Sequence, residues 1–370
     1  MKQTIYIMLL LACLLAMGAC SSEDIASQKE ESRDAKVRLT AAISSSKAST
    51  RADENQNLVP SCIKTAFNKN DKIRFVNTVF FSTPIFDNTT IFKATGEYDE
   101  TKGYEFTQSG TSSETQDTES DTGSNSNALT WNDFRPTSFV YTFEAAYDPQ
   151  GDYNNQIPSD QNTQLNFLNA DLLLASHRMP IEQRNEDIEL IFRHALAMVR
   201  IDITMPISLG LQKDAIQEAV LQGMQTQYEV DYKSSIDGGQ LRHVEGTGET
   251  RTITMYKLNA PVSTDNKTQD YTFVAIIPVP GEDINQDDFV RFKIKVNNTD
   301  TWYGFKRNEG QNTIKLEQSK ITHLKLTLNS EGGTPLLISA EVKDWSNAYT
   351  EVTLEEDDKE TTVEQPEQEQ

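Results

Sequence analysis

The sequence predicts an all-β protein built from antiparallel β-sandwiches. Apolar and polar residues alternate strictly in several stretches, the pattern of strands with one buried face, and most clearly over 290–296. A more continuous apolar run at 271–277, ended by Pro278 and Pro280, is typical of a buried central strand. Helical periodicity is scarce. Many strands separated by turn residues favour sandwiches over the other fold classes.

Further strands are predicted along the chain, some of them from the same alternation. The first covers 37–43, where Val37, Leu39, Ala41 and Ile43 share one face. The segment 212–224 fits either a short helix or a strand, and the polar stretches 107–127 and 151–164 are predicted to be exposed loops. The other predicted strands are 72–77, 138–145, 172–176, 199–203, 251–258, 324–328 and 337–342.

The first segment of the chain predicts export and lipidation. Lys2 is followed by an apolar run, 5–17, that is too short to span a bilayer but fits the core of a signal peptide. Gly18 and Ala19 then precede Cys20, and this order resembles the bacterial lipobox, in which the thiol receives a diacylglycerol before cleavage. We therefore expect a signal peptide over 1–19, cleavage between Ala19 and Cys20, and a lipid on Cys20; the alternative is an ordinary secretory signal with an incidental cysteine.

Both ends of the mature chain are polar and charged. Residues 20–35 form a predicted flexible tether, and its acidic start at 21–24 resembles the signal that sends some lipoproteins to the outer face of the outer membrane. The acidic tail 355–370 is predicted to be disordered. The net charge of −22 argues against nucleic acid as a partner, because phosphates would be repelled. The remaining length favours two domains.

The sequence carries no recognisable catalytic or metal-binding motif. Its four histidines stand in no spacing that suits zinc, and it has neither a nucleophile elbow nor a phosphate loop. We predict no catalytic residue, metal or cofactor, and we expect His194 to be a buried histidine with a satisfied side chain. Cys13 leaves with the signal peptide and Cys20 is acylated, so Cys62 has no partner for a disulfide and is predicted to be buried.

Four segments together resemble the fimbrillin family, the pilus subunits and related surface lipoproteins of Gram-negative anaerobes. Their order and spacing, behind a lipobox, carry the resemblance over nearly the whole mature chain. The segments are the first strand 37–43 followed by Thr50-Arg51-Ala52, the stretch 67–77 with Asn70-Asp71-Lys72-Ile73, the stretch 191–201, and the late strand 337–342 followed by Lys343-Asp344-Trp345.

The resemblance implies a fold and a route of assembly. It implies two transthyretin-like β-sandwich domains, at 36–186 and 187–354. It also implies that an extracellular arginine-specific protease cuts between Arg51 and Ala52 and removes the tether with the first strand, whose inward residues are Val37, Leu39, Ala41 and Ile43. A strand from another subunit then fills the open groove. The protein would be lipid-anchored at the outer membrane as a precursor and part of a fimbrium, supporting adhesion, after processing.

Several alternatives stay open at the level of the sequence. The chain fits a stalk subunit, an accessory or tip subunit, or an unprocessed anchor in which Arg51 stays intact. The donated strand would come from 337–342 or 352–354. A surface glycan-binding lipoprotein is the alternative from another functional class, and exposed aromatic residues grouped on one sheet face would favour it. A host or bacterial surface receptor is a further partner that the sequence does not identify.

Overall fold

The computed structural model describes most of the predicted body of the protein. The described residues are 35–44, 58–77, 90–99, 102–109, 129–207, 214–232, 234, 240–258, 268–284, 288–296, 299–304, 314–328 and 336–344. The predicted signal peptide, Cys20, the Arg51-Ala52 bond, most of the loop 107–127 and the acidic tail lie outside these residues.

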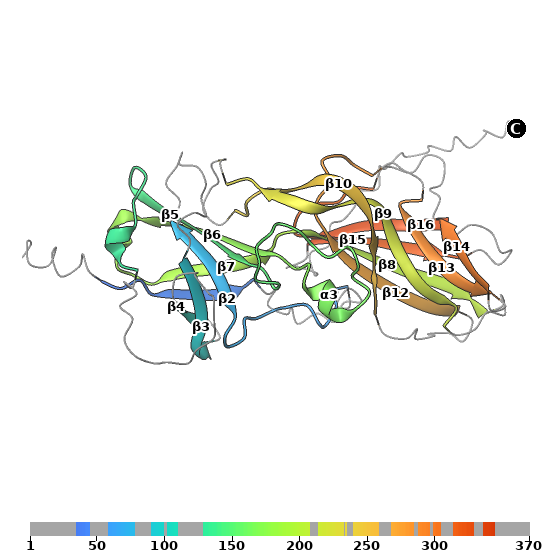
Figure 1. Ribbon diagram of the computed structural model, residues 1–370, viewed down its shortest axis with the longest axis horizontal. Coiled ribbons are helices and arrows are strands. Elements are labelled where there is room, and N and C mark those ends of the chain that lie inside the picture. The colour runs from blue at the N-terminus through green and yellow to red at the C-terminus, as the bar shows by residue number, and fades with distance from the viewer. Residues whose placement is uncertain are drawn as a thin grey trace, which may run out of the picture.

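The first half of the chain forms a closed barrel in the order β1-β4-β3-β2-β5-β6-β7. Figure 1 shows this barrel and the second half side by side along the long axis of the molecule, with the short helix α3 (Gln164–Leu168) between them. Two short 3-10 helices, η2 and η3, cover Trp131–Asp133 and Ile181–Gln183. The barrel strands are β1 Leu39–Ile43, β2 Lys72–Asn77, β3 Thr90–Asp99, β4 Gly103–Gln108, β5 Val140–Tyr147, β6 Leu173–Pro180 and β7 Ile188–His194.

The second half forms two facing sheets with one hydrophobic core between them. One sheet has the order β10-β9-β13-β14 and the other β11-β12-β8-β15-β16. Their inward residues, such as Ile201, Leu221 and Phe292, are fully buried in this core. The strands are β8 Ala197–Pro206, β9 Ile216–Val230, β10 Val244–Thr254, β11 Tyr256–Lys257, β12 Thr268–Ile277, β13 Val290–Val296, β14 Thr299–Gly304, β15 Lys320–Thr327 and β16 Leu336–Asp344.

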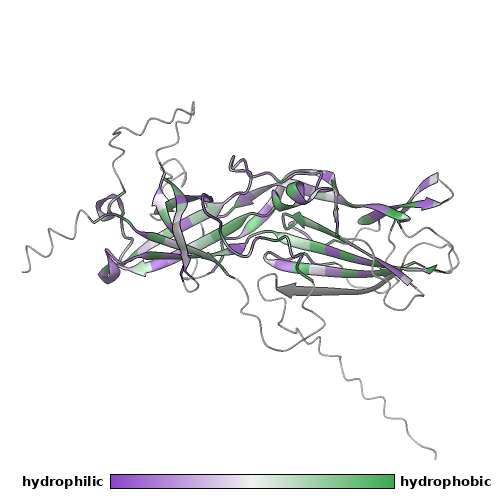
Figure 2. Cartoon of the chain, turned by 90° about the horizontal axis from the view of Figure 1, so that it is seen from below, coloured by the Kyte–Doolittle hydropathy of each residue, from purple (hydrophilic) through white to green (hydrophobic). Residues whose placement is uncertain are grey.

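The predicted all-β class is confirmed, because almost every described element is a strand. Figure 2 shows hydrophobic and hydrophilic residues alternating along strands of both halves, which is the pattern that predicted them. The first half closes into a barrel where an antiparallel sandwich was expected, since β1 pairs antiparallel with β4 and in parallel with β7 and so joins the two edges. No described helix is long and apolar enough to cross a membrane.

Aromatic side chains fill much of the barrel interior. Phe67 lies in the segment before β2, and its ring packs edge-on against those of Phe106 and Phe192 at centroid distances of 5.3 and 5.0 Å. Trp131 is fully buried and packs edge-on against Phe134 and Tyr141. Edge-to-face contacts of this kind add to the burial of large apolar area, so the barrel has a core of its own.

The strands divide between β7 and β8 rather than at the predicted domain boundary. That boundary, between 186 and 187, falls directly before β7, but β7 pairs with β1 and β6 and therefore belongs to the barrel. The loop predicted at 151–164 is also more than an exposed connection. Ile157 and Gln161 are buried, and the Gln161 amide exchanges two hydrogen bonds with the backbone of Ile276 in β12, at 2.8 and 2.9 Å.

Candidate functional site

The predicted exchangeable strand, β1, is seated between two other barrel strands. Leu39, Thr40 and Ala41 pair antiparallel with β4, and all five residues of β1 pair in parallel with β7, from Leu39 opposite Ile188 to Ile43 opposite Phe192. Both neighbours retain other partners, since β4 pairs with β3 and β7 with β6. Removal of β1 would therefore leave a groove between two strands that remain part of the barrel.

The inward face of β1 is the one that the alternation predicted. Leu39, Ala41 and Ile43 are 0%, 1% and 6% exposed and belong to the barrel core. Val37, expected in the same strand, lies before β1 and is only partly buried against this core; its N–H donates to the carbonyl of Leu129. A large apolar side chain contributes about 1.5–3 kcal/mol when it is fully buried. Leu39 and Ile43 therefore provide much of the free energy that keeps β1 in the barrel.

The backbone of β1 passes unusually close to Gly103 at the start of β4. Gly103 has a φ of +79°, and a Cβ added there would lie 2.1 Å from the carbonyl oxygen of Ala41. Only glycine fits at this contact, because any side chain would collide with the backbone of β1. The tight turn before β4 therefore determines how closely β1 can approach its antiparallel neighbour.

The chain that follows the predicted cleavage position is held on the second half of the molecule. Arg51 stands midway between Ser44 and Leu58, the described residues on either side. Leu58 and Ile63 are buried in the core of the two sheets, and the Leu58 carbonyl accepts a hydrogen bond from Arg200 Nη1 at 3.0 Å. The segment on the far side of Arg51 is thus anchored away from the barrel.

Cys62 lies in the same anchored segment. It is a free cysteine of intermediate exposure that packs against the core of the two sheets, so the prediction that it is buried holds only in part. Partial burial raises the pKa of its thiol, because desolvation disfavours the thiolate.

A buried ion pair joins the barrel to the second half. The Glu144 carboxylate in β5 accepts hydrogen bonds from Arg242 Nε at 2.8 Å and Nη2 at 2.5 Å, and one from Ser176 Oγ at 3.1 Å. Both charged side chains are at most 4% exposed. Gln318 Nε2 donates to the carbonyl of Arg242 at 2.6 Å and so links this pair to the segment before β15.

Two buried histidines have carboxylate partners. His194, at the end of β7, is as buried as predicted, and its Nδ1 lies 2.7 Å from Asp171 Oδ1. His323 in β15 places Nε2 2.6 Å from Asp202 Oδ2, while Thr272 Oγ1 donates to Asp202 Oδ1 at 2.7 Å. Burial would raise the pKa of Asp202, but the His323 hydrogen bond, the Arg200 charge and the Thr272 hydrogen bond outweigh it and lower that pKa.

Replacing Asp202 by asparagine is expected to lower the free energy of unfolding at pH 7 by about 1–2 kcal/mol, because it weakens charge-assisted hydrogen bonds from three side chains. A carboxylate with a lowered folded-state pKa stabilises the fold above its unfolded pKa of about 3.9, and this contribution is lost as the pH falls through the lower folded value. Urea unfolding of both proteins at pH 7 and pH 3 should show the gap shrinking in acid. An equal gap at both values would contradict the assignment.

The described residues offer neither a metal site nor an aromatic platform. Among them, no group of three or more His, Cys, Asp or Glu residues is placed to hold a metal ion. The exposed aromatic residues of the described part are Tyr98 in β3, Phe139 before β5 and Trp302 in β14. They come from separate elements in both halves, so the grouping that would favour a glycan-binding face is not observed among them.

The fold and this site define a class of protein. It is an all-β protein in which a short N-terminal strand completes a barrel that adjoins two facing sheets. A family model described as fimbrillin-like matches residues 50–345, which is most of the chain. The chain belongs to the fimbrillin-like family. No curated protein matches it.

The solved structures that match this chain have low sequence identity to it. One, described as a candidate cell adhesion protein from Bacteroides ovatus, is 14% identical, covers 84% of this chain and 98% of its own, and has a TM-score of 0.49. The tip fimbrial protein Mfa3 from Porphyromonas gingivalis is 8% identical over 84% of this chain and 100% of its own, with a TM-score of 0.38. The fimbrial anchor protein Mfa2 from the same organism is 9% identical over 84% and 97%, with a TM-score of 0.36.

Membership in the family supports a role as a fimbrial subunit at the cell surface. It also favours a structural role over an enzymatic one.

Proposed function

We propose that this protein is a fimbrial subunit that is exported as a lipoprotein and assembles by protease-triggered strand exchange. Cleavage between Ala19 and Cys20 and acylation of Cys20 hold the precursor at the outer membrane. An arginine-specific extracellular protease then cuts between Arg51 and Ala52, so that β1 is no longer covalently joined to the body. A strand from a neighbouring subunit replaces β1 between β4 and β7 and carries the subunit into the fibre.

The seat of β1 is the observation that carries this proposal. β1 contributes three buried side chains to the barrel and pairs on both sides, yet it is a five-residue strand at the edge of the described chain. The chain beyond Arg51 is anchored elsewhere, by Leu58 and Ile63 on the second half. A cut at Arg51 therefore breaks the covalent link between β1 and the body while Leu58 and Ile63 stay anchored on the second half. The groove left behind would have two unpaired strand edges that favour a new strand.

The sequence of β16 supports 337–342 as the donated segment. Ile338-Ser339-Ala340-Glu341-Val342 repeats the order of Leu39-Thr40-Ala41-Ala42-Ile43: a large aliphatic residue, a hydroxyl residue, alanine, a fourth residue and a β-branched residue. The central alanine matters because Ala41 is 1% exposed in the barrel core, and a larger residue there would overpack it. The other candidate, Val352-Thr353-Leu354, lacks this order and is followed by acidic residues.

Cleavage is tested on protein purified from cells. The N-terminal sequence and intact mass are measured before and after brief digestion with an arginine-specific protease. We expect an acylated Cys20 terminus before digestion, and an Ala52 terminus with ladders of higher mass afterwards. The matched control is Arg51→Ala, which should keep the first terminus and form no ladder. If the native protein keeps its Cys20 terminus and Arg51 resists digestion, processing is excluded and an uncut anchor becomes the better assignment.

The donor segment is tested with synthetic peptides, so that the folding of the donor subunit is not at issue. A labelled peptide of residues 336–344 should bind the processed protein and not the uncut precursor, in which β1 fills the groove. The same peptide with Ala340→Phe should bind at least tenfold more weakly, since the larger side chain overpacks the core. Equal binding by both peptides, or tighter binding by a peptide of residues 350–358, would reject this donor.

A further inference from the structure

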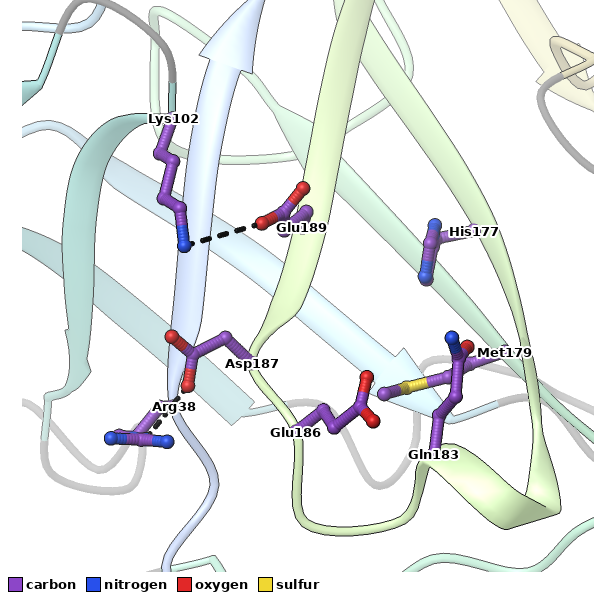
Figure 3. A pocket seen from close by; sticks show the side chains of 8 residues that line it. All are labelled: Arg38, Lys102, His177, Met179, Gln183, Glu186, Asp187 and Glu189. Atoms are coloured by element: carbon purple, nitrogen blue, oxygen red, sulfur yellow. Dashed lines mark ion pairs between the residues drawn. The ribbon is translucent and has the colours of Figure 1, made fainter.

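The contact between β6 and β7 has the fewest paired residues of the strand contacts that close the barrel, and that between β1 and β4 follows with three. β6 and β7 share only two residue pairs, Leu173 with His194 and Leu174 with Arg193, whereas β5 and β6 share eight and β1 and β7 share five. Figure 3 shows the two strands that carry His177 and Glu189 spreading apart toward the connection at Gln183 and Glu186. The barrel therefore has a wedge-shaped opening on the side of β7 away from β1.

Backbone groups of both strands are directed into this opening. Ile188 N–H donates to the Arg38 carbonyl and Ser44 N–H to the Phe192 carbonyl, so even-numbered residues of β7 bond to β1. The intervening residues Glu189 and Ile191 consequently direct their N–H and C=O groups toward β6. By the same alternation, Ser176 and Arg178 of β6 direct theirs toward β7. No described ladder pair reaches these four residues across the opening.

The opening is hollow and its walls differ in character. It contains a cavity of about 440 Å³, lined by side chains from β6, β7, the connection between them and the neighbouring strand and turn (Figure 3). His177 and Met179 form the β6 wall. Burial lowers the pKa of His177 despite the nearby Glu189 charge, so this wall is neutral at neutral pH. The lining residues are Arg38, Lys102, His177, Met179, Gln183, Glu186, Asp187 and Glu189.

Carboxylates outnumber the available cations on the opposite wall. Arg38 Nε lies 2.7 Å from Asp187 Oδ1, and Lys102 Nζ lies 3.6 Å from Glu189 Oε1, so both lining cations are already paired. Glu186 has no ion-pair partner among the described residues. The whole chain carries a net charge of −22, so a positively charged ligand would bind in this cavity more favourably than a neutral or negative one.

We propose that the opening between β6 and β7 is a second strand-accepting site, separate from the seat of β1, for an extended segment of a partner protein. The segment inserts between the two free edges and pairs with the backbone of Glu189 and Ile191 on one side and of Ser176 and Arg178 on the other. Its inward side chains are small and apolar, to fit against Met179 and His177. Its outward side chains are lysine or arginine, and they face Glu186 and Glu189.

The test measures amide hydrogen exchange in the full chain, alone and with a synthetic peptide that alternates lysine and valine. The amide protons of Glu189 and Ile191 should exchange quickly in the free protein and at least tenfold more slowly when the peptide is bound. A peptide of the same composition with the lysines and valines in two blocks is the control for simple charge attraction, because it cannot present alternate faces. It should leave these two amides unprotected.

Two variants separate strand insertion from surface binding. Ile191→Pro removes the N–H directed into the opening and leaves the bonds of β7 to β1 intact, so it should weaken the alternating peptide at least tenfold with no change in melting temperature. Ile191→Thr keeps that N–H while removing the apolar side chain, which is 60% exposed, and should bind normally. Slow exchange of both amides in the free protein, equal binding of the block peptide, or an unaffected proline variant would each overturn the proposal.

Discussion

Replacing Glu144 by alanine is expected to lower the free energy of unfolding by about 3–5 kcal/mol, the largest effect we foresee for any single substitution. The change leaves the Arg242 guanidinium buried at 4% exposure without its carboxylate. An uncompensated charge of this kind is costly because the protein interior solvates it poorly. Since Glu144 belongs to the barrel and Arg242 to the segment before β10, the loss should also weaken the junction between the two halves.

Denaturant unfolding followed by tryptophan fluorescence can measure both effects, because Trp131 lies in the barrel and Trp302 in β14. We expect a lower midpoint and a separation of the transition into two steps. The double variant Glu144→Leu with Arg242→Met removes both charges and should recover most of the lost stability. A single variant that costs less than about 1 kcal/mol would show that this pair is not an important link between the halves.

Replacing Gly103 by alanine is expected to lower the free energy of unfolding by about 2–4 kcal/mol. Part of the cost is backbone strain, because Gly103 has a φ of +79° that other residues rarely adopt. The rest arises because the new Cβ would lie 2.1 Å from the Ala41 carbonyl oxygen, so that β1 has to move away from β4. The damage should thus centre on the strand that the proposed assembly removes.

Thermal melting gives the overall loss for Gly103→Ala, and hydrogen exchange at the amides of Leu39 and Ala41, which face β4, reports whether β1 is loosened from β4. Gly151→Ala is the matched control, because Gly151 also has a positive φ, of 75°, yet has no atom within 4 Å of an added Cβ. It should show the strain alone. If the two variants lose the same stability and β1 exchanges normally in both, the contact with Ala41 is unimportant.

Strands with one clearly buried face were predictable from the sequence, and strands with little apolar contrast were not. The segment 290–296 alternates without interruption, and 72–77 alternates as far as Phe75; the two match β13 and β2 at both ends. The missed strands include β4 and β14. Four of the six residues of β14 are exposed, so hydrogen bonds to β13 define it while its own side chains bury little. The ambiguous segment 212–224 is largely part of β9, whose long pairing with β10 no local pattern reveals.

The inward face of β1 could be predicted from its alternation, whereas its surroundings could not. Leu39 pairs with Phe106 on one side and Ile188 on the other, and such distant pairings depend on the whole topology. Glu144 and Arg242 show the same limit, because each is an ordinary charged residue in the sequence and they meet only where the two halves join. The opening between β6 and β7 could not be predicted from the sequence either, because it arises where backbone pairing between these two strands stops.

The direction of β1 has a mechanical consequence. This strand lies along the long axis of the molecule, parallel to β7 (Figure 1). In a fibre that runs along this axis, a donated strand seated in the same place would be pulled along its own length when the fibre is stretched. The hydrogen bonds on both of its sides would then carry the tension in shear and share it, instead of opening one after another as in peeling. A strand loaded in this way would resist rapid pulling better than its equilibrium affinity suggests, which suits a surface fibre exposed to flow.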